Sequence, residues 1–264
     1  MKGEPSFERL VNIMARLRSE KGCPWDREQT RQSLKPFIIE EAYELLEAIE
    51  KEEPDQIKEE LGDLLFQIIF QCQIASERGE FDIWDVIEAI TEKMLNRHPH
   101  VFGKDRVDDS AQVLKRWEEH KRREGKLRES VLEGIPAALP SLLRAQRVQE
   151  RASRVGFDWQ KTEEVSDKLR EELREFEEAL QKGDREEIES EIGDLLFTIV
   201  NISRFSGINP EDALRRTTEK FISRFRYIEE EARKKARELT DLTLTEMNAL
   251  WEKAKREKDR QDRQ

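Results

Sequence analysis

The 264-residue chain has few residues that interrupt helices or cross-link a chain, with 11 glycines, 8 prolines and 2 cysteines. Because glycine and proline disfavour helix interiors, their scarcity predicts long helices joined by few turns. Cys23 and Cys72 lie far apart and outside any CxxC pattern, which argues against a disulfide framework or a cysteine-based zinc site. No run approaches the roughly 18 apolar residues of a membrane span, and the opening MKGEPSFERL has no apolar signal region. We therefore expect a cytoplasmic protein.

The charge balance is acidic, since Asp and Glu outnumber Lys and Arg and give a net charge of −11. An acidic chain is a poor partner for a nucleic-acid polymer, whose phosphates attract a basic face. A phosphorylated small molecule is still a possible substrate, because a bound metal ion can supply the positive charge. The sequence has no GxxxxGK[ST] pattern, which argues against P-loop motor or kinase chemistry.

An internal repeat organises the chain. Residues 34–70 align with residues 165–201 without a gap, and fourteen of the 37 positions are identical. EEAYE matches EELRE, and ELGDLLF matches EIGDLLF. The repeat predicts two tandem homologous domains, residues 1–125 and 126–264, each of ordinary domain size. The junction falls where glycine and proline gather, in and around EGIPAALP.

Each repeat carries two helical patterns, because apolar residues recur at three- and four-residue steps. Pro54 suits the first turn of the second helix in the first repeat, and Gly183 suits the end of the first helix in the second repeat. We therefore expect a helix–turn–helix hairpin in each domain. No strand-like alternation of useful length is present, so the predicted fold class is all-α, with two helical-bundle domains in tandem.

Four carboxylates are predicted to meet in each hairpin. Glu41 and Glu44 are three residues apart and share a helix face, as do Glu60 and Asp63. In an antiparallel hairpin, residues at one level have a constant sum of residue numbers, and both Glu44 with Glu60 and Glu41 with Asp63 give 104. The second repeat places its equivalents level in the same way, and these are Glu172, Glu175, Glu191 and Asp194.

Such a quartet is costly unless its carboxyl groups take up protons or bind a cation, because like charges repel at close range. Oxygen-only ligands favour Mg²⁺, Mn²⁺ or Ca²⁺, and a magnesium site suits phosphoanhydride chemistry. The alternative is that Glu-rich helices present solvated faces. A di-iron site would want Glu-x-x-His, and all three histidines lie outside the hairpins. Gly62 and Gly193, inside the second helices, indicate close approach of a ligand or of a packed neighbour.

Both EExxE…ExxD patterns, with GCPWDREQT, RHPHVFG, RAQRVQ, VGFDW and EKFISRF around them, resemble the two-domain bacterial MazG nucleoside triphosphate pyrophosphohydrolases. The resemblance covers nearly the whole chain. It implies an all-α, dimeric enzyme that uses Mg²⁺, or Mn²⁺, held by the four carboxylates. It also implies hydrolysis of ribo- or deoxyribonucleoside triphosphates to monophosphate and pyrophosphate, in nucleotide-pool cleansing or regulation.

The resemblance assigns roles position by position. The quartets Glu41, Glu44, Glu60, Asp63 and Glu172, Glu175, Glu191, Asp194 are the implied metal ligands. Glu171, and Glu40 in the first domain, are implied to orient or deprotonate the attacking water. The residues implied to bind the phosphates and the nucleotide are Lys220, Arg224 and Trp251, with Lys93, Arg97 and Trp117 in the first domain. The open alternatives are a non-enzymatic nucleotide-sensing scaffold and a purely structural hairpin protein.

Overall fold

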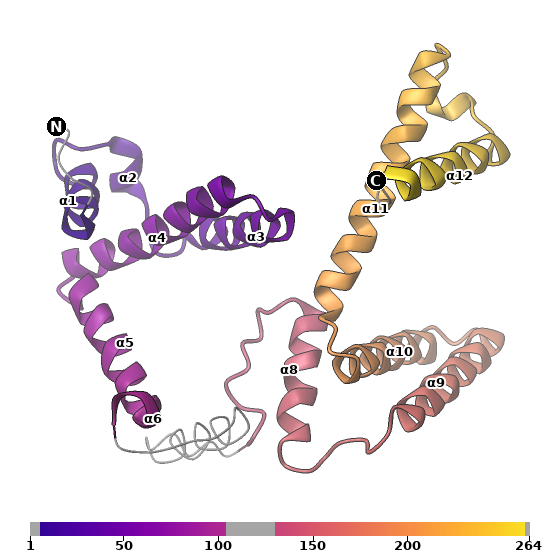
Figure 1. Ribbon diagram of the computed structural model, residues 1–264, viewed down its shortest axis with the longest axis horizontal. Coiled ribbons are helices and arrows are strands. Elements are labelled where there is room, and N and C mark those ends of the chain that lie inside the picture. The colour runs from indigo at the N-terminus through magenta and orange to yellow at the C-terminus, as the bar shows by residue number, and fades with distance from the viewer. Residues whose placement is uncertain (1–5, 104–129, 262–264) are drawn as a thin grey trace. The chain divides into compact units, whose positions relative to one another are not determined.

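The computed structural model describes residues 6–103 and 130–261 of the chain (Figure 1). The chain divides into two compact units, Met1–Lys126 and Leu127–Gln264. Every regular element within the described ranges is a helix, which confirms the predicted all-α class. None of these helices is long and apolar enough to cross a membrane. The expected boundary between residues 125 and 126 lies outside the described ranges and stays a prediction.

The first unit is built on a helical hairpin. Its helices are α1 (Phe7–Leu17), α2 (Pro24–Glu28), α3 (Lys35–Lys51), α4 (Pro54–Glu77), α5 (Ile83–Arg97) and α6 (Pro99–Phe102). The predicted hairpin is formed by α3 and α4, which pack along each other, and Pro54 lies in the first turn of α4 as expected. Met14 of α1 and Ile69 and Phe70 of α4 are almost fully buried in one core. This core anchors the end of α4 that lies away from the hairpin turn.

The second unit repeats the hairpin. Its helices are α8 (Ser141–Ser153), α9 (Thr162–Lys182), α10 (Arg185–Phe205), α11 (Pro210–Lys234) and α12 (Leu244–Gln261), with a 3₁₀ turn at Leu239–Asp241. The second hairpin is formed by α9 and α10, and α8 packs against α10. A separate small core joins α11 to α12 through Ile228, Ala232 and Leu250.

Both hairpins turn on a residue in the left-handed region. Gly183 ends α9 with φ of +71°, as predicted for a helix stop. The aligned position of the first hairpin is Glu52, which ends α3 with φ of +55°. A side chain is disfavoured there because its Cβ approaches the backbone. The two turns thus have the same geometry with and without a Cβ atom.

The outer face of α3 is apolar and exposed. Ile39, Tyr43 and Leu46 lie on one helical face, and their exposed fractions are 58%, 43% and 44%. We call these three residues the α3 stripe. The aligned positions of α9 are charged, being Arg170, Arg174 and Glu177. The two hairpins have the same arrangement of helices, but the outer face is apolar on α3 and charged on α9.

A candidate metal centre in each hairpin

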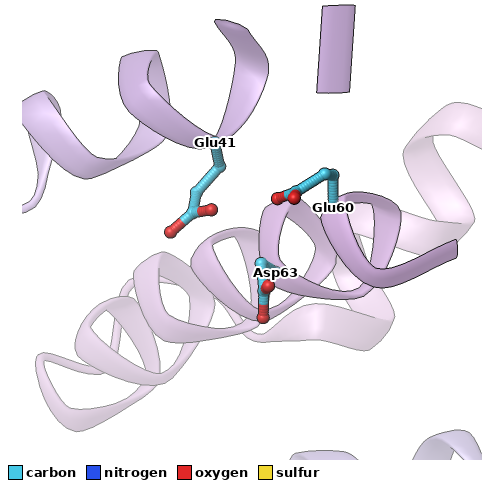
Figure 2. A group of neighbouring side chains, drawn as sticks. All are labelled: Glu41, Glu60 and Asp63. Atoms are coloured by element: carbon cyan, nitrogen blue, oxygen red, sulfur yellow. The ribbon is translucent and has the colours of Figure 1, made fainter. Parts of the chain in front are cut away.

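The first hairpin brings carboxylates from both of its helices together. Glu41 reaches from α3 toward α4, which carries Glu60 and Asp63 (Figure 2). One oxygen from each of these three groups lies within 4.8 Å of the other two. Glu44, one turn further along α3, is close enough to Glu60 to raise the pKa of that carboxyl. The four residues therefore form one acidic group at one level of the hairpin.

The second hairpin gathers the equivalent residues, but a different three of them lie closest together. One carboxylate oxygen from each of Glu172, Glu175 and Glu191 lies within 4.8 Å of the other two. Asp194, one turn after Glu191, adds its negative charge and raises the pKa of Glu191. Glu172 is buried, with 6% of its surface exposed. The same four positions thus converge in both copies, because the i, i+3 spacing and the antiparallel pairing are the same in each.

The carboxyl groups carry more negative charge than their surroundings compensate. Burial raises the pKa of Glu41, and the charges of Asp63 and Glu44 raise it further. Burial also raises the pKa of Glu191, followed by the charge of Glu175. Oε2 of Glu191 is buried and has no hydrogen-bond partner among the described residues. An orphaned carboxylate oxygen within an all-oxygen group is what a hard divalent cation would satisfy, so the residues fit Mg²⁺ or Mn²⁺.

The two quartets differ in what lies beside them. The side chain of Gln67 shares a hydrogen bond with Glu41, which offsets part of the rise in the pKa of that carboxyl. In the second hairpin Lys168 Nζ lies 2.9 Å from Glu172 Oε1. Neither Gln67 nor Lys168 is among the site residues predicted from the sequence. The position of Lys168, three residues before Glu171 and four before Glu172, was the available signal for an ion pair on one helix face.

The two residues expected to act on water flank the predicted metal ligands. Glu171 precedes Glu172 on α9, and its side chain is 46% exposed. A hydrogen bond from Lys168 Nζ, at 2.9 Å, lowers the pKa of Glu171. Glu40, its equivalent on α3, is also exposed. Each therefore stands at the solvent side of its quartet, where a water molecule has access.

The structure joins two of the residues expected to bind the nucleotide. The guanidinium carbon of Arg224 lies 5.4 Å from the ring centroid of Trp251, and the buried Nε of Arg224 has no hydrogen-bond partner in the part of the chain that the structure describes. Lys220 lies one turn earlier on α11 and is exposed. These contacts lie between α11 and α12, so the approach of the three residues to the quartet of α9 and α10 stays a prediction. In the first unit Lys93 is exposed and Arg97 is buried on α5, and Trp117 lies outside the described residues.

The two helix-interior glycines have open space beside them. A Cβ atom built at Gly62 or at Gly193 would meet nothing within 4 Å in the described parts of the chain. The packed neighbour that we considered as one reason for these glycines is therefore not found within residues 6–103 and 130–261. Space beside each quartet is left for a ligand or for another molecule.

The sequence model of the MazG nucleotide pyrophosphohydrolase domain matches the chain twice, at residues 29–102 and 160–229. Each matched segment contains one complete quartet. The chain belongs to the MazG family. This confirms the resemblance seen in the sequence.

Relatives match the chain along almost its whole length. A nucleoside triphosphate pyrophosphohydrolase/pyrophosphatase MazG of Thermotoga maritima is 50% identical over 250 residues, covering 94% of this chain and 95% of the relative. A nucleoside triphosphate pyrophosphohydrolase of Escherichia coli K12 is 44% identical over 256 residues, covering 95% of this chain and 97% of the relative. An uncharacterized Bacillus subtilis protein, YabN, is 45% identical over 251 residues, covering 94% of this chain and 51% of the relative. The MazG relatives therefore share both hairpins with this chain.

Proposed function

We propose that the chain hydrolyses nucleoside triphosphates to nucleoside monophosphate and pyrophosphate, with a divalent cation, in nucleotide-pool cleansing or regulation. The observation that carries the proposal is the four-carboxylate group, which recurs in both hairpins and in which burial and neighbouring carboxylates raise the pKa values of Glu41 and Glu191. Two relatives of nearly the same length are named for this activity. The family-wide pattern and the local chemistry therefore point to one reaction.

Mg²⁺ is the proposed cofactor, and Mn²⁺ is a possible substitute. A cation held by the carboxylates would polarise the phosphate oxygens and offset their charge. The buried, partnerless Oε2 of Glu191 supports a ligand role for that residue. The proposed ligands are Glu41, Glu44, Glu60 and Asp63 in the first hairpin, and Glu172, Glu175, Glu191 and Asp194 in the second.

Glu171, and Glu40 in the first domain, are proposed to orient the attacking water and accept its proton. The hydrogen bond from Lys168 lowers the pKa of Glu171, so this carboxyl is ionised near neutral pH and can accept a hydrogen bond that orients the water. The water oxygen bonds to the α-phosphorus, the bond from that phosphorus to the α,β-bridging oxygen breaks, and pyrophosphate leaves. The proton moves to the glutamate carboxylate, and the nucleoside keeps one phosphate.

The basic and aromatic residues are proposed to hold the nucleotide. Arg224 has a guanidinium group suited to two phosphate oxygens, and its neighbour Trp251 offers a ring face to the nucleotide. Lys220 adds a second positive charge on the same face of α11. The matching first-domain residues are Lys93, Arg97 and Trp117.

We also propose that the chain forms a homodimer in the cytoplasm. The α3 stripe supports the dimer, since three large apolar side chains on one helical face are 43% exposed or more in the single chain. Cys23 and Cys72 are free thiols, as is usual in a reducing compartment. Sedimentation equilibrium tests the dimer. We expect Tyr43→Glu to shift the mass toward one chain, and an unchanged dimer mass would remove the α3 stripe from the interface.

Product analysis tests the activity. ATP, dGTP and dUTP are incubated with the protein, with Mg²⁺ or with a chelator, and the products are separated by ion-exchange chromatography. We expect monophosphate and pyrophosphate only when Mg²⁺ is present. Glu172→Gln and Glu41→Gln then show which hairpin carries the activity, and Glu59→Gln, on the exposed side of α4, is the matched control. Diphosphate with phosphate, or no turnover, would favour the nucleotide-sensing scaffold.

A further inference from the structure

A lysine of the second hairpin makes two contacts with acidic groups of the candidate metal centre. Lys168 Nζ lies 2.9 Å from Glu172 Oε1 and 2.9 Å from Glu171 Oε1. The Glu172 side chain is 7% exposed, whereas the Lys168 side chain is 34% exposed. The pair therefore joins a buried carboxylate to an ammonium group at its solvent side. An ion pair with one buried partner is screened less by water than a pair on an open surface.

The first hairpin has no such lysine. Phe37 occupies the aligned position, and its ring packs against Trp25 with a centroid separation of 5.9 Å. The hydrogen bond to Glu41 comes instead from the neutral side chain of Gln67. Within residues 6–103, no ion pair is described for the carboxylates of the first quartet. The two sites therefore share their acidic residues and differ by one nearby positive charge.

We propose that Lys168 is a built-in counter-cation of the second quartet, which competes with the divalent cation for Glu172 and weakens metal binding there. This inference rests on the proposed function, because it concerns the same site. A cation that binds Glu172 must replace or share the contact between Nζ and Oε1. The ammonium group would then stand beside a doubly charged ion and repel it. Lys168 is thus a positioning residue, which acts through Glu172 on the metal.

Direct metal binding tests the proposal. The full chain carries Glu41→Gln and Glu60→Gln, so that only the second quartet is complete, and free Mn²⁺ is measured by electron paramagnetic resonance. Lys168→Gln is added to this background. A control chain carries Glu172→Gln and Glu191→Gln in addition to the first two changes, so that neither quartet is complete. Its Mn²⁺ binding measures the background from other surface carboxylates. Circular dichroism checks that every variant keeps its helices.

Two further variants separate charge from position. Lys168→Arg keeps the positive charge next to Glu172. Lys182→Gln removes a lysine of the same helix that lies outside the quartet. Nζ of Lys182 is 2.8 Å from Oε2 of Glu187. We expect Lys168→Gln to lower the Mn²⁺ dissociation constant about two- to fivefold, the size of effect that one ion pair gives. Lys168→Arg and Lys182→Gln should leave the constant unchanged.

The outcomes distinguish this inference from the function on which it rests. An unchanged or weaker Mn²⁺ affinity in Lys168→Gln would overturn the counter-cation role and leave the metal site standing. The same tightening in Lys182→Gln would also overturn it, because the cause would then be net charge and not the contact with Glu172. A third outcome is that the chain with only the second quartet complete binds Mn²⁺ no more strongly than the control chain without either quartet. That result would exclude a metal site in the second hairpin, and with it both the counter-cation role of Lys168 and the proposed metal-dependent function of that hairpin.

Discussion

The guanidinium carbon of Arg224 lies 5.4 Å from the ring centroid of Trp251, across the turn that separates α11 from α12. The ring of Phe221 contacts the same indole, with a centroid separation of 5.0 Å. A cation over an aromatic face is attracted by the electrons of the ring. The contact therefore holds the guanidinium group of Arg224 in one place, which would reduce the entropy lost in the phosphate binding that we propose for this residue.

Arg224→Ala is expected to weaken nucleotide binding about 10- to 100-fold, since a hydrogen bond between charged groups contributes roughly 1.5–3 kcal/mol. The measurement is isothermal titration with an α,β-methylene triphosphate, which is not cleaved at the reactive bond. Arg226→Ala is the matched control, because Arg226 is an exposed arginine two residues along the same helix. Equal affinities in the two variants would exclude Arg224 from the phosphate site.

Glu191→Gln is expected to make the metal-free chain more stable and the metal-bound chain less stable. The substitution removes a charge from a crowded group, so Tm measured with a chelator should rise. It also removes a proposed metal ligand, so the increase in Tm caused by Mg²⁺ should be lost, along with at least tenfold in activity. Differential scanning calorimetry with and without Mg²⁺ measures both effects. Glu189→Gln, on the exposed part of α10, should change neither.

Stability without metal is expected to depend on pH through the same carboxyl groups. The pKa values of Glu41, Glu60 and Glu191 are raised in the folded chain, so the folded chain binds their protons at a higher pH than the unfolded chain does. Their contribution to stability is fully present below the unfolded pKa, roughly 4.3, and is lost as pH rises through the raised values. Replacing all three by Gln should therefore stabilise the chain more at pH 7 than at pH 4.5.

Thermal unfolding in chelator at both pH values measures this difference. The unchanged chain and the triple Gln variant are compared at each pH. This comparison cancels the contributions that other groups, such as Glu246, make to stability. Its partner Arg237 lowers the pKa of Glu246 to about 2, and the stability from that pair is lost only as pH falls toward that value. A stabilisation of equal size at pH 7 and pH 4.5 would mean that the three carboxyl groups do not have raised pKa values.

The hairpin turns give a matched pair of substitutions. Glu52→Gly should stabilise the first hairpin by up to about 1 kcal/mol, because glycine has no Cβ to strain the left-handed backbone. Gly183→Ala should destabilise the second by about 1 kcal/mol for the same reason. Among the described residues, a Cβ at Gly183 would touch nothing within 4 Å, so the expected cost comes from backbone conformation. Urea unfolding measures both changes, and two changes of the same sign would contradict this account.

The sequence was enough to predict the hairpins and the residues that meet in each. Spacings of three residues place Glu41 with Glu44, and Glu60 with Asp63, on single helical faces. The antiparallel turn then fixes which faces oppose each other, and the repeat supplied an independent second instance. These relationships are local, so backbone geometry determines them without knowledge of the tertiary packing.

The sequence did not predict features that depend on side-chain conformation or on long-range packing. Lys168 has several acidic neighbours on α9, and only its rotamer shows that it contacts Glu171 and Glu172. The contact of Arg224 with Trp251 joins residues 27 positions apart, which no helical period relates. The open space beside Gly62 depends on what the rest of the chain leaves uncovered.

A chain that holds two copies of one hairpin risks pairing its halves with each other during synthesis, when the first copy emerges before the second. The α3 stripe and the charged residues aligned with it on α9 bear on this hazard. Placing the α3 stripe against Arg170, Arg174 and Glu177 would strip water from those charges without offering them partners. The difference between the outer faces of α3 and α9 thus disfavours mispairing of the two hairpins. The acidic residues of the two quartets are the same in both copies.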